Sequence, residues 1–145
     1  MPDPALTYRG AVYPWHCDHM GHMNVMWYVG KFDEATWHFF RMLGLTPSLL
    51  KASDRGMAAV EQNIRYKQEL HAGDVVSIYT EALEIRDKSI RFAHEMRDDD
   101  TGMVAATTLL TAVHLDTIAR RACPLPAAIR QRAEAMLCAD PSRWA

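Results

Sequence analysis

Cysteines are scarce in this sequence: Cys17, Cys123 and Cys138 are the only three, and no two of them form a CxxC pair. An odd number of widely spaced cysteines is typical of reduced thiols, so no disulfide is expected. Long hydrophobic runs are also lacking, because the longest mostly apolar stretch, 103–113, is well short of the roughly 20 residues that span a bilayer. The N-terminus shows no basic segment followed by an apolar run. We therefore expect a cytoplasmic protein with no membrane partner.

An excess of charge of one sign is missing as well. The chain has 16 lysines and arginines against 18 aspartates and glutamates, which gives a formal net charge of -2. Domains that bind nucleic acid usually carry a basic excess, so no nucleic-acid partner is expected. The 145 residues, 49% of them hydrophobic, fit a single globular domain over residues 1–145. A chain of this length buries about two-thirds of its unfolded surface, which is enough for one hydrophobic core.

Residues 24–43 carry a helical pattern, with apolar side chains recurring on one face and polar ones on the other. Asn24 can cap the start of this helix, because its side-chain oxygen can accept a bond from an unpaired N–H of the first turn. Gly44, with Pro47 beyond it, marks the end. The predicted apolar face comprises Val25, Val29, Phe32, Thr36, Phe39, Phe40 and Leu43, and the predicted polar face comprises Lys31, Glu34, His38 and Arg41.

After Gly56 the pattern changes to the alternation that is typical of strands. Four runs rich in β-branched and aromatic residues predict strands at 58–70, 74–85, 89–98 and 103–115. The short connections between them contain turn-forming residues, which favours an antiparallel meander. A further strand is predicted at 7–13, and a terminal helix that begins at Pro126 is predicted at 126–139. Together these elements predict a two-layer α+β domain, in which one long helix covers a five-stranded antiparallel sheet.

The stretch HCDHMGHMN at 16–24 gathers three histidines, a cysteine, an aspartate and an asparagine just before the predicted helix. A zinc site is one interpretation, because His16, His19 and His22 are evenly spaced and imidazole is a common zinc ligand. Against it, all of these ligands would lie on one short loop, and no second cluster follows downstream. We therefore expect no metal. The remaining interpretations are a solvated loop that ends in a helix cap and a catalytic loop.

The motif DHMGHMNVMWY at 18–28, followed by FDEAT at 32–36, resembles the hotdog-fold acyl-CoA thioesterases of the 4-hydroxybenzoyl-CoA thioesterase and YbgC-like type. The resemblance extends over about residues 6–125 and is most specific at Asp18, Gly21, His22, Asn24 and Tyr28. It implies a hotdog fold, a catalytic carboxylate at Asp18 and hydrolysis of an acyl-CoA substrate without a cofactor. It also implies self-association as a homodimer or homotetramer, with sites between the subunits.

Thioester chemistry explains why few catalytic groups could suffice. The thiolate leaving group has a conjugate acid with a pKa of about 8.5 or below, so its departure needs little help from a general acid. Asp18 is ionised at neutral pH and could either deprotonate a water or attack the carbonyl to form an anhydride. Backbone N–H groups around Asn24 and Val25, at the start of the helix, could hold the oxyanion. Gly21 would let the backbone turn sharply, and His22 and Asn24 could orient Asp18 or the water.

A coenzyme A ester also carries phosphates and an acyl group, which need binding surfaces of their own. Basic residues near turns are candidates for the phosphates, and large apolar residues are candidates for the acyl pocket. Glu61 is a second carboxylate that could reach the site. The candidate substrate-binding residues are Trp27, Tyr28, Met57, Glu61, Arg65, Lys88, Ser89, Arg91 and Arg120. The pattern does not select the acyl group. Two alternative functions stay open, a hotdog-fold acyl-thioester hydratase or dehydratase and a non-catalytic acyl-CoA-binding module.

Overall fold

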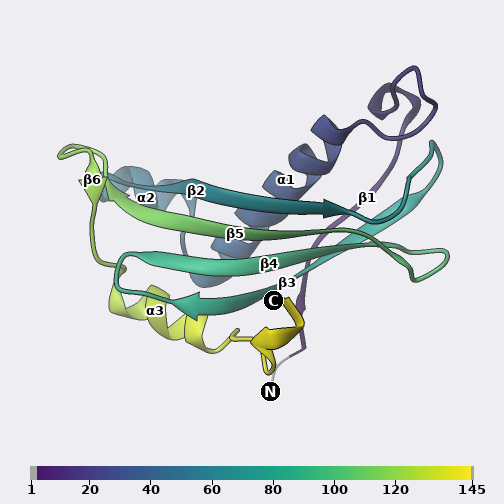
Figure 1. Cartoon of the computed structure of the whole chain (residues 1–145). Coiled ribbons are helices and arrows are strands. Elements are labelled where there is room, and N and C mark those ends of the chain that lie inside the picture. The colour runs from purple at the N-terminus through teal and green to yellow at the C-terminus, as the bar shows by residue number, and fades with distance from the viewer. Residues whose placement is uncertain (1–2, 145) are drawn as a thin grey trace.

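The computed structural model describes residues 3–144, and its elements follow the predicted order (Figure 1). The long elements are β1 (Ala5–Ala11), α1 (Val25–Leu43), β2 (Arg55–Tyr66), β3 (Val75–Ile85), β4 (Ser89–Asp98) and β5 (Val104–Asp116). The shorter ones are η1 (Pro14–His16), α2 (Pro47–Ala52), β6 (Arg121–Ala122), α3 (Ala127–Glu134) and η2 (Pro141–Trp144). The sequence had predicted neither α2 nor β6.

The strands form one antiparallel sheet in the order β1-β3-β4-β5-β2, and the short β6 extends it by pairing with the end of β5. Figure 1 shows the sheet curving around α1, which lies across one of its faces. The predicted two-layer α+β arrangement is therefore confirmed. The sheet has six strands rather than five, because residues after β5 turn back to pair Leu115 with Ala122.

The terminal helix is shorter than predicted, because α3 ends at Glu134 and not at residue 139. The chain leaves the helix to satisfy backbone groups of β3 that no strand covers. Strand β1 pairs with β3 only as far as Thr80. Beyond that point, the Ala82 N–H donates to the Met136 carbonyl at 3.1 Å, and the Ala82 carbonyl accepts from the Cys138 N–H at 2.7 Å. An unpaired buried N–H or C=O is costly, so hydrogen bonding of residues 136–138 to Ala82 is favoured over continuation of the helix.

Helix α1 begins and ends where the sequence indicated. The Asn24 side chain caps its start, and Gly44 ends it in the left-handed region, at a φ of 93°. A side chain at Gly44 would also overlap the guanidinium of Arg132.

The predicted faces of α1 are partly wrong, because Val25 and Val29 are exposed whereas Lys31 is buried at 3% exposure. Lys31 faces β1, which crosses this side of the helix. Helical periodicity alone does not show where the edge strand will pass.

A buried histidine lies between α1 and the sheet. His94 is fully buried, and its Nε2 lies 2.8 Å from the Thr36 hydroxyl while its Nδ1 lies 2.6 Å from the Thr80 hydroxyl. Thr80 in turn contacts Thr7, so that a chain of hydrogen bonds links α1, β4, β3 and β1. Phe32 stacks on the imidazole ring. Burial lowers the pKa of His94 to about 3, so the ring is neutral at physiological pH.

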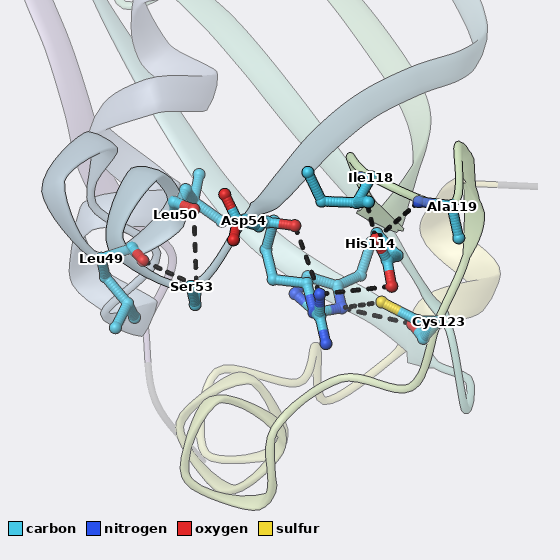
Figure 2. Close-up of polar contacts among 10 residues, drawn as sticks. Leu49, Leu50, Ser53, Asp54, His114, Ile118, Ala119 and Cys123 are labelled. Carbon is cyan, nitrogen blue, oxygen red and sulfur yellow. Dashed lines mark hydrogen bonds and ion pairs between the residues drawn. The ribbon is translucent and has the colours of Figure 1, made fainter.

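A group of polar contacts holds the end of the sheet where β2 begins and β5 ends (Figure 2). Arg55 donates to the carbonyl of Asp54 at 3.2 Å and forms an ion pair with Asp116 at 3.4 Å. The buried His114 lies 3.2 Å from the carbonyl oxygen of Cys123 and 3.3 Å from its Sγ. These contacts fix the turn that precedes β2 against the segment that follows β5, as Figure 2 shows.

Candidate active site

The loop between η1 and α1 is a hydrogen-bonded turn whose tip, residues 19–21, is exposed to solvent. Cys17 and Met23 form an antiparallel bridge across it. Inside the bridge the Asp18 N–H donates to the carbonyl of His22 at 3.2 Å, and the Gly21 N–H donates to the carbonyl of Asp18 at 3.0 Å. Gly21 has a φ of 85°, which a residue with a side chain adopts only with strain. The turn therefore presents Asp18 at a fixed position just before α1.

The Asp18 carboxylate accepts two hydrogen bonds. Its Oδ2 accepts from the Asn24 Nδ2 at 3.0 Å, and its Oδ1 accepts from the Met20 N–H at 2.9 Å. These bonds lower the pKa of Asp18 below its ordinary value, with the Asn24 bond as the largest cause and the Met20 bond next. The side chain is thus an ionised carboxylate over the physiological pH range, as a general base or an anionic nucleophile must be.

The first backbone N–H of α1, at Val25, remains free. The Met26 N–H donates to the Asn24 side-chain oxygen at 3.0 Å, and the Trp27 N–H donates to the Asn24 carbonyl at 2.9 Å. The Asn24 N–H itself donates to the carbonyl of His16. Within residues 3–144, the Val25 N–H has no hydrogen-bond acceptor. It lies at the positive end of the helix dipole, where developing negative charge is stabilised.

Val25 also lines a groove of about 260 Å³ between the start of α1 and the segment that follows β2. His22 lies in this groove, with its Nε2 3.7 Å from a carboxylate oxygen of Glu69. Tyr28 is buried here and donates to the carbonyl of Gln68 at 3.0 Å, and burial raises the pKa of its hydroxyl to about 12. The groove is lined by His22, Met23, Val25, Tyr28, Tyr66, Lys67, Gln68 and Glu69.

Gln68 is a site residue that the sequence did not indicate. Its side-chain oxygen is buried and has no hydrogen-bond partner in the part of the chain that the structure describes. It sits just after β2, in a segment predicted to be strand, where the backbone N–H of Gln68 still donates to the carbonyl of Ala105 in β5 at 3.1 Å. No local pattern distinguishes it from the polar residues around it. Only the contact between this segment and the start of α1 makes it a groove residue.

A second groove, of about 340 Å³, runs between α1 and β2. Gln62 faces it from β2, and Asp33 faces it from α1. Glu61, the predicted second carboxylate, does not. A bulge between Ala59 and Glu61 shifts the register of β2, so that Glu61 lies on the sheet face opposite α1. Arg65 shares that outer face and lines a shallow pocket there.

Trp27 lies in the first turn of α1 and packs against His16, near Asp18. The five other predicted substrate-binding residues lie far from Asp18 within one chain. Met57 pairs with His114 near the start of β2 and packs against the core, so it does not line either groove. Lys88 and Ser89 lie at the turn into β4, and Arg120 lies in the turn after β5. Arg91 projects from β4 on the sheet face away from α1, in a pocket with Glu84, Pro141 and Trp144. All of them belong to the end of the sheet, or the face of it, that is remote from the start of α1.

The three histidines of the loop do not converge. The His16 Nδ1 accepts from the Tyr13 N–H at 2.9 Å, whereas His22 contacts Glu69. Over residues 3–144, the structure contains no group of three His, Cys, Asp or Glu side chains arranged to hold a metal ion. None of the helices described there is long and apolar enough to cross a bilayer.

Comparison with known proteins assigns a family to this arrangement. The sequence profile of the thioesterase-like superfamily matches residues 12–133, which include the Asp18 turn, α1 and the whole meander. The chain belongs to this superfamily. The match confirms a thioesterase-type domain, whereas the narrower likeness to the 4-hydroxybenzoyl-CoA thioesterase and YbgC-like type stays a prediction.

Individual proteins resemble this chain over most of its length. An L-carnitine dehydrogenase/betainyl-CoA thioesterase of Ruegeria pomeroyi is 30% identical over 139 residues, which cover 93% of this chain and 28% of that protein. The chain thus spans little more than a quarter of that relative. A betainyl-CoA thioesterase of Pseudomonas aeruginosa is 24% identical over 136 residues, which cover 94% of this chain and 86% of that protein.

A solved structure supports the same fold. A Staphylococcus aureus protein in complex with CoA has a TM-score of 0.87 at 18% identity, with 97% of this chain and 90% of that chain covered. At this level of identity the likeness concerns the fold alone. Together with the superfamily match, it confirms the hotdog fold that the sequence predicted.

Proposed function

We propose that this protein hydrolyses acyl-CoA thioesters, with Asp18 as the general base or nucleophile and the start of α1 as the oxyanion hole. The observation that carries the proposal is the double role of Asn24. Its amide nitrogen holds the Asp18 carboxylate, and its amide oxygen caps α1 through Met26. The carboxylate is therefore fixed beside the helix end that leaves the Val25 N–H free.

Two routes are compatible with this geometry. In the first, the Asp18 carboxylate removes a proton from water, the resulting hydroxide adds to the thioester carbonyl, and the CoA thiolate leaves. In the second, the carboxylate attacks the carbonyl directly, and water then hydrolyses the acyl-aspartyl anhydride. In both, the carbonyl oxygen becomes negative next to the Val25 N–H, where the helix dipole strengthens the interaction. Neither route requires a cofactor.

The relatives suggest which acyl group to test first. Both proteins described above carry the name betainyl-CoA thioesterase, so a short acyl group that bears a quaternary ammonium is the leading candidate. The groove at Val25 contains the carboxylate of Glu69, which can attract such a cation, alongside the aromatic rings of Tyr28 and Tyr66. We propose CoA rather than acyl carrier protein as the carrier, because both relatives are named as thioesterases of a CoA ester.

A second copy of the chain would explain the remaining predicted residues. Lys88, Ser89 and Arg120 lie at the far end of the sheet from Asp18 within one chain. If two chains pair along their outer β2 strands in antiparallel fashion, the far end of one sheet is brought toward the start of α1 in the other. The phosphates of a bound CoA would then meet basic residues of the second subunit, as the resemblance to hotdog thioesterases implies.

Release of free thiol from a panel of acyl-CoAs tests the proposal. We expect turnover with betainyl-CoA, and slower turnover with acetyl-CoA, benzoyl-CoA and a long-chain acyl-CoA. The same panel should contain crotonyl-CoA, whose hydration without thiol release would indicate the hydratase alternative. Binding of acyl-CoA without any chemical change would indicate the non-catalytic module. Either result would contradict the proposed hydrolysis.

A further inference from the structure

A third groove lies on the other side of α1, where β1 and η1 pass the helix. It has a volume of about 500 Å³ and shares no residue with the groove at Val25. Its lining combines one lysine, one glutamate and several aromatic rings. The lining residues are Tyr8, Gly10, Ala11, Tyr13, Trp15, His16, Trp27, Gly30, Lys31 and Glu34.

Lys31 gives this groove a cation without a counter-ion. The residue is 3% exposed, and its Nζ donates to the Tyr8 hydroxyl at 2.8 Å and more weakly to the Ala11 carbonyl at 3.4 Å. Both acceptors are neutral, and among residues 3–144 no carboxylate forms an ion pair with it. Burying an ammonium group without an anion is unfavourable. The charge and the third N–H of Lys31 are therefore available to an anionic group in the groove.

The position of Tyr8 depends on Gly10. A Cβ atom at Gly10 would overlap the hydroxyl of Tyr8, whose ring lies along β1 over that position. Only glycine leaves the space that the ring needs to reach Lys31. The ring also lies 5.2 Å from the ammonium, measured to the ring centroid, so that it contributes a cation–π contact as well as an acceptor.

Aromatic rings form the outer wall of the groove. Tyr13 and Trp15 stack in parallel with their centroids 4.5 Å apart, and His16 packs against Trp27 at 4.6 Å. Trp15 is 67% exposed, so much of its ring is open to a ligand in the groove. The wall is not itself cationic, because burial, and then the charge of Lys31, lower the pKa of His16.

Glu34 places a carboxylate in the same groove, one helical turn after Lys31. The groove thus presents a cation beside β1, an anion on the exposed part of α1 and aromatic faces near both. An anionic ligand alone would leave Glu34 unmatched, and a cationic ligand alone would be repelled by Lys31. A ligand with separate charges of both signs satisfies each group. Aromatic faces favour a methylated ammonium in particular, because it gives up little hydration when it contacts a ring.

We propose that this groove binds a small zwitterion, with its carboxylate on Lys31 and its quaternary ammonium group against Tyr13, Trp15 and Trp27, near Glu34. The site does not depend on the hydrolysis proposed above, because it should bind the free zwitterion when no thioester is present. Hydrolysis without zwitterion binding would overturn only this inference, and zwitterion binding without hydrolysis would overturn only the proposed function.

Calorimetric titration of the full chain with glycine betaine tests the inference. We expect saturable binding of one molecule per chain. The matched ligand is 3,3-dimethylbutyrate, which keeps the shape and the carboxylate but has an uncharged carbon in place of the ammonium nitrogen. It should bind at least about threefold more weakly, because cation–π attraction is lost. Tetramethylammonium, which lacks the carboxylate, should bind more weakly than glycine betaine as well. Equal affinity for glycine betaine and 3,3-dimethylbutyrate, or no saturable binding of glycine betaine, would overturn the inference.

Variants locate the binding in this groove. Lys31→Met should weaken glycine betaine binding about tenfold or more, because the carboxylate loses its charged partner. Trp15→Leu should weaken it about threefold to thirtyfold through the loss of a ring face. Lys51→Met and Trp37→Leu are matched controls at residues outside the groove, and they should leave the affinity unchanged. Glu34→Gln, at an exposed position that does not threaten folding, should reduce the preference for glycine betaine over 3,3-dimethylbutyrate. Unchanged affinity in Lys31→Met and Trp15→Leu would place the binding elsewhere and refute the assignment.

Discussion

Asn24 and Asp18 are joined by a single hydrogen bond of 3.0 Å from the Asn24 Nδ2 to the Asp18 Oδ2. The other end of the same amide accepts the N–H of Met26 at 3.0 Å and so caps α1. One side chain thus connects the candidate catalytic carboxylate to the helix end that would stabilise the oxyanion. The position of the base and the position of the oxyanion hole are consequently not independent.

The first prediction concerns the carboxylate itself. Asp18→Asn should lower kcat for acyl-CoA hydrolysis by about 10²-fold or more, because an amide is neither a base nor an anionic nucleophile. The fold should be retained, since the amide is nearly isosteric and Asp18 lies on an exposed turn. Thiol release measures the rate, and circular dichroism checks the fold. Asp100→Asn, at an exposed position in the turn between β4 and β5, serves as a control for general effects of losing a carboxylate. Near wild-type turnover in Asp18→Asn would move the catalytic role to another residue.

The second prediction separates the two roles of Asn24. Asn24→Ser should keep the helix cap but lose the hydrogen bond to Asp18, and so the pKa of Asp18 should rise. Because the ionised carboxylate is the active form, activity is lost as the pH falls through this pKa. The acidic limb of the kcat/KM profile should therefore lie at higher pH in Asn24→Ser than in the wild type. Following thioester absorbance directly allows measurement at acidic pH. An unmoved acidic limb would argue against Asp18 as the titrating group.

Asn24→Ala extends the same test to stability. It should show the same shift in the pH profile and, in addition, lose about 1 kcal/mol of unfolding free energy, because alanine cannot cap the helix. Urea denaturation of the wild type and both variants measures this difference. A stability loss in Asn24→Ser equal to that in Asn24→Ala would show that the serine hydroxyl does not replace the cap.

The third prediction follows from the buried His94. Its pKa is about 3 in the folded protein, against about 6.5 in the unfolded chain. Between these values the unfolded state binds a proton that the folded state does not, so the free energy of unfolding falls as the pH is lowered below about 6.5. The contribution is about 1.4 kcal/mol per pH unit. Urea denaturation at pH 6.5 to 4.5 measures the difference in unfolding free energy between the wild type and His94→Gln. This difference should shrink or reverse as the pH falls. A difference that does not depend on pH would contradict a neutral, buried His94.

The fourth prediction concerns self-association. Strand β2 pairs with β5 along one edge only, and in residues 3–144 no strand pairs with its other edge. A long unpaired edge favours pairing with a second chain. Sedimentation equilibrium at micromolar concentration should accordingly give a species of at least twice the 16.5 kDa of one chain. A stable monomer that still turns over substrate would contradict a site shared between subunits.

The sequence by itself was sufficient for the elements that local rules govern. The helix at 24–43 has its cap at Asn24 and its terminating glycine at Gly44, as the structure confirms. The strands after Gly56 were recognisable from their alternation, and their short connections from turn chemistry. The sequence also indicated that Asp18 lies just before the helix. These features depend on neighbours within a few residues, and so they can be read along the chain.

The tertiary structure alone decided which side chains share a surface. A one-residue bulge in β2 moved Glu61 to the outer face of the sheet, and it brought Gln62 to the groove beside α1. The passage of β1 across the helix buried Lys31, which the periodicity had assigned to the polar face. Strand register and the path of an edge strand depend on contacts between residues far apart in sequence, where a shift of one residue reverses the direction of every side chain that follows. Local propensity does not predict such a shift in register, so only the folded chain shows it.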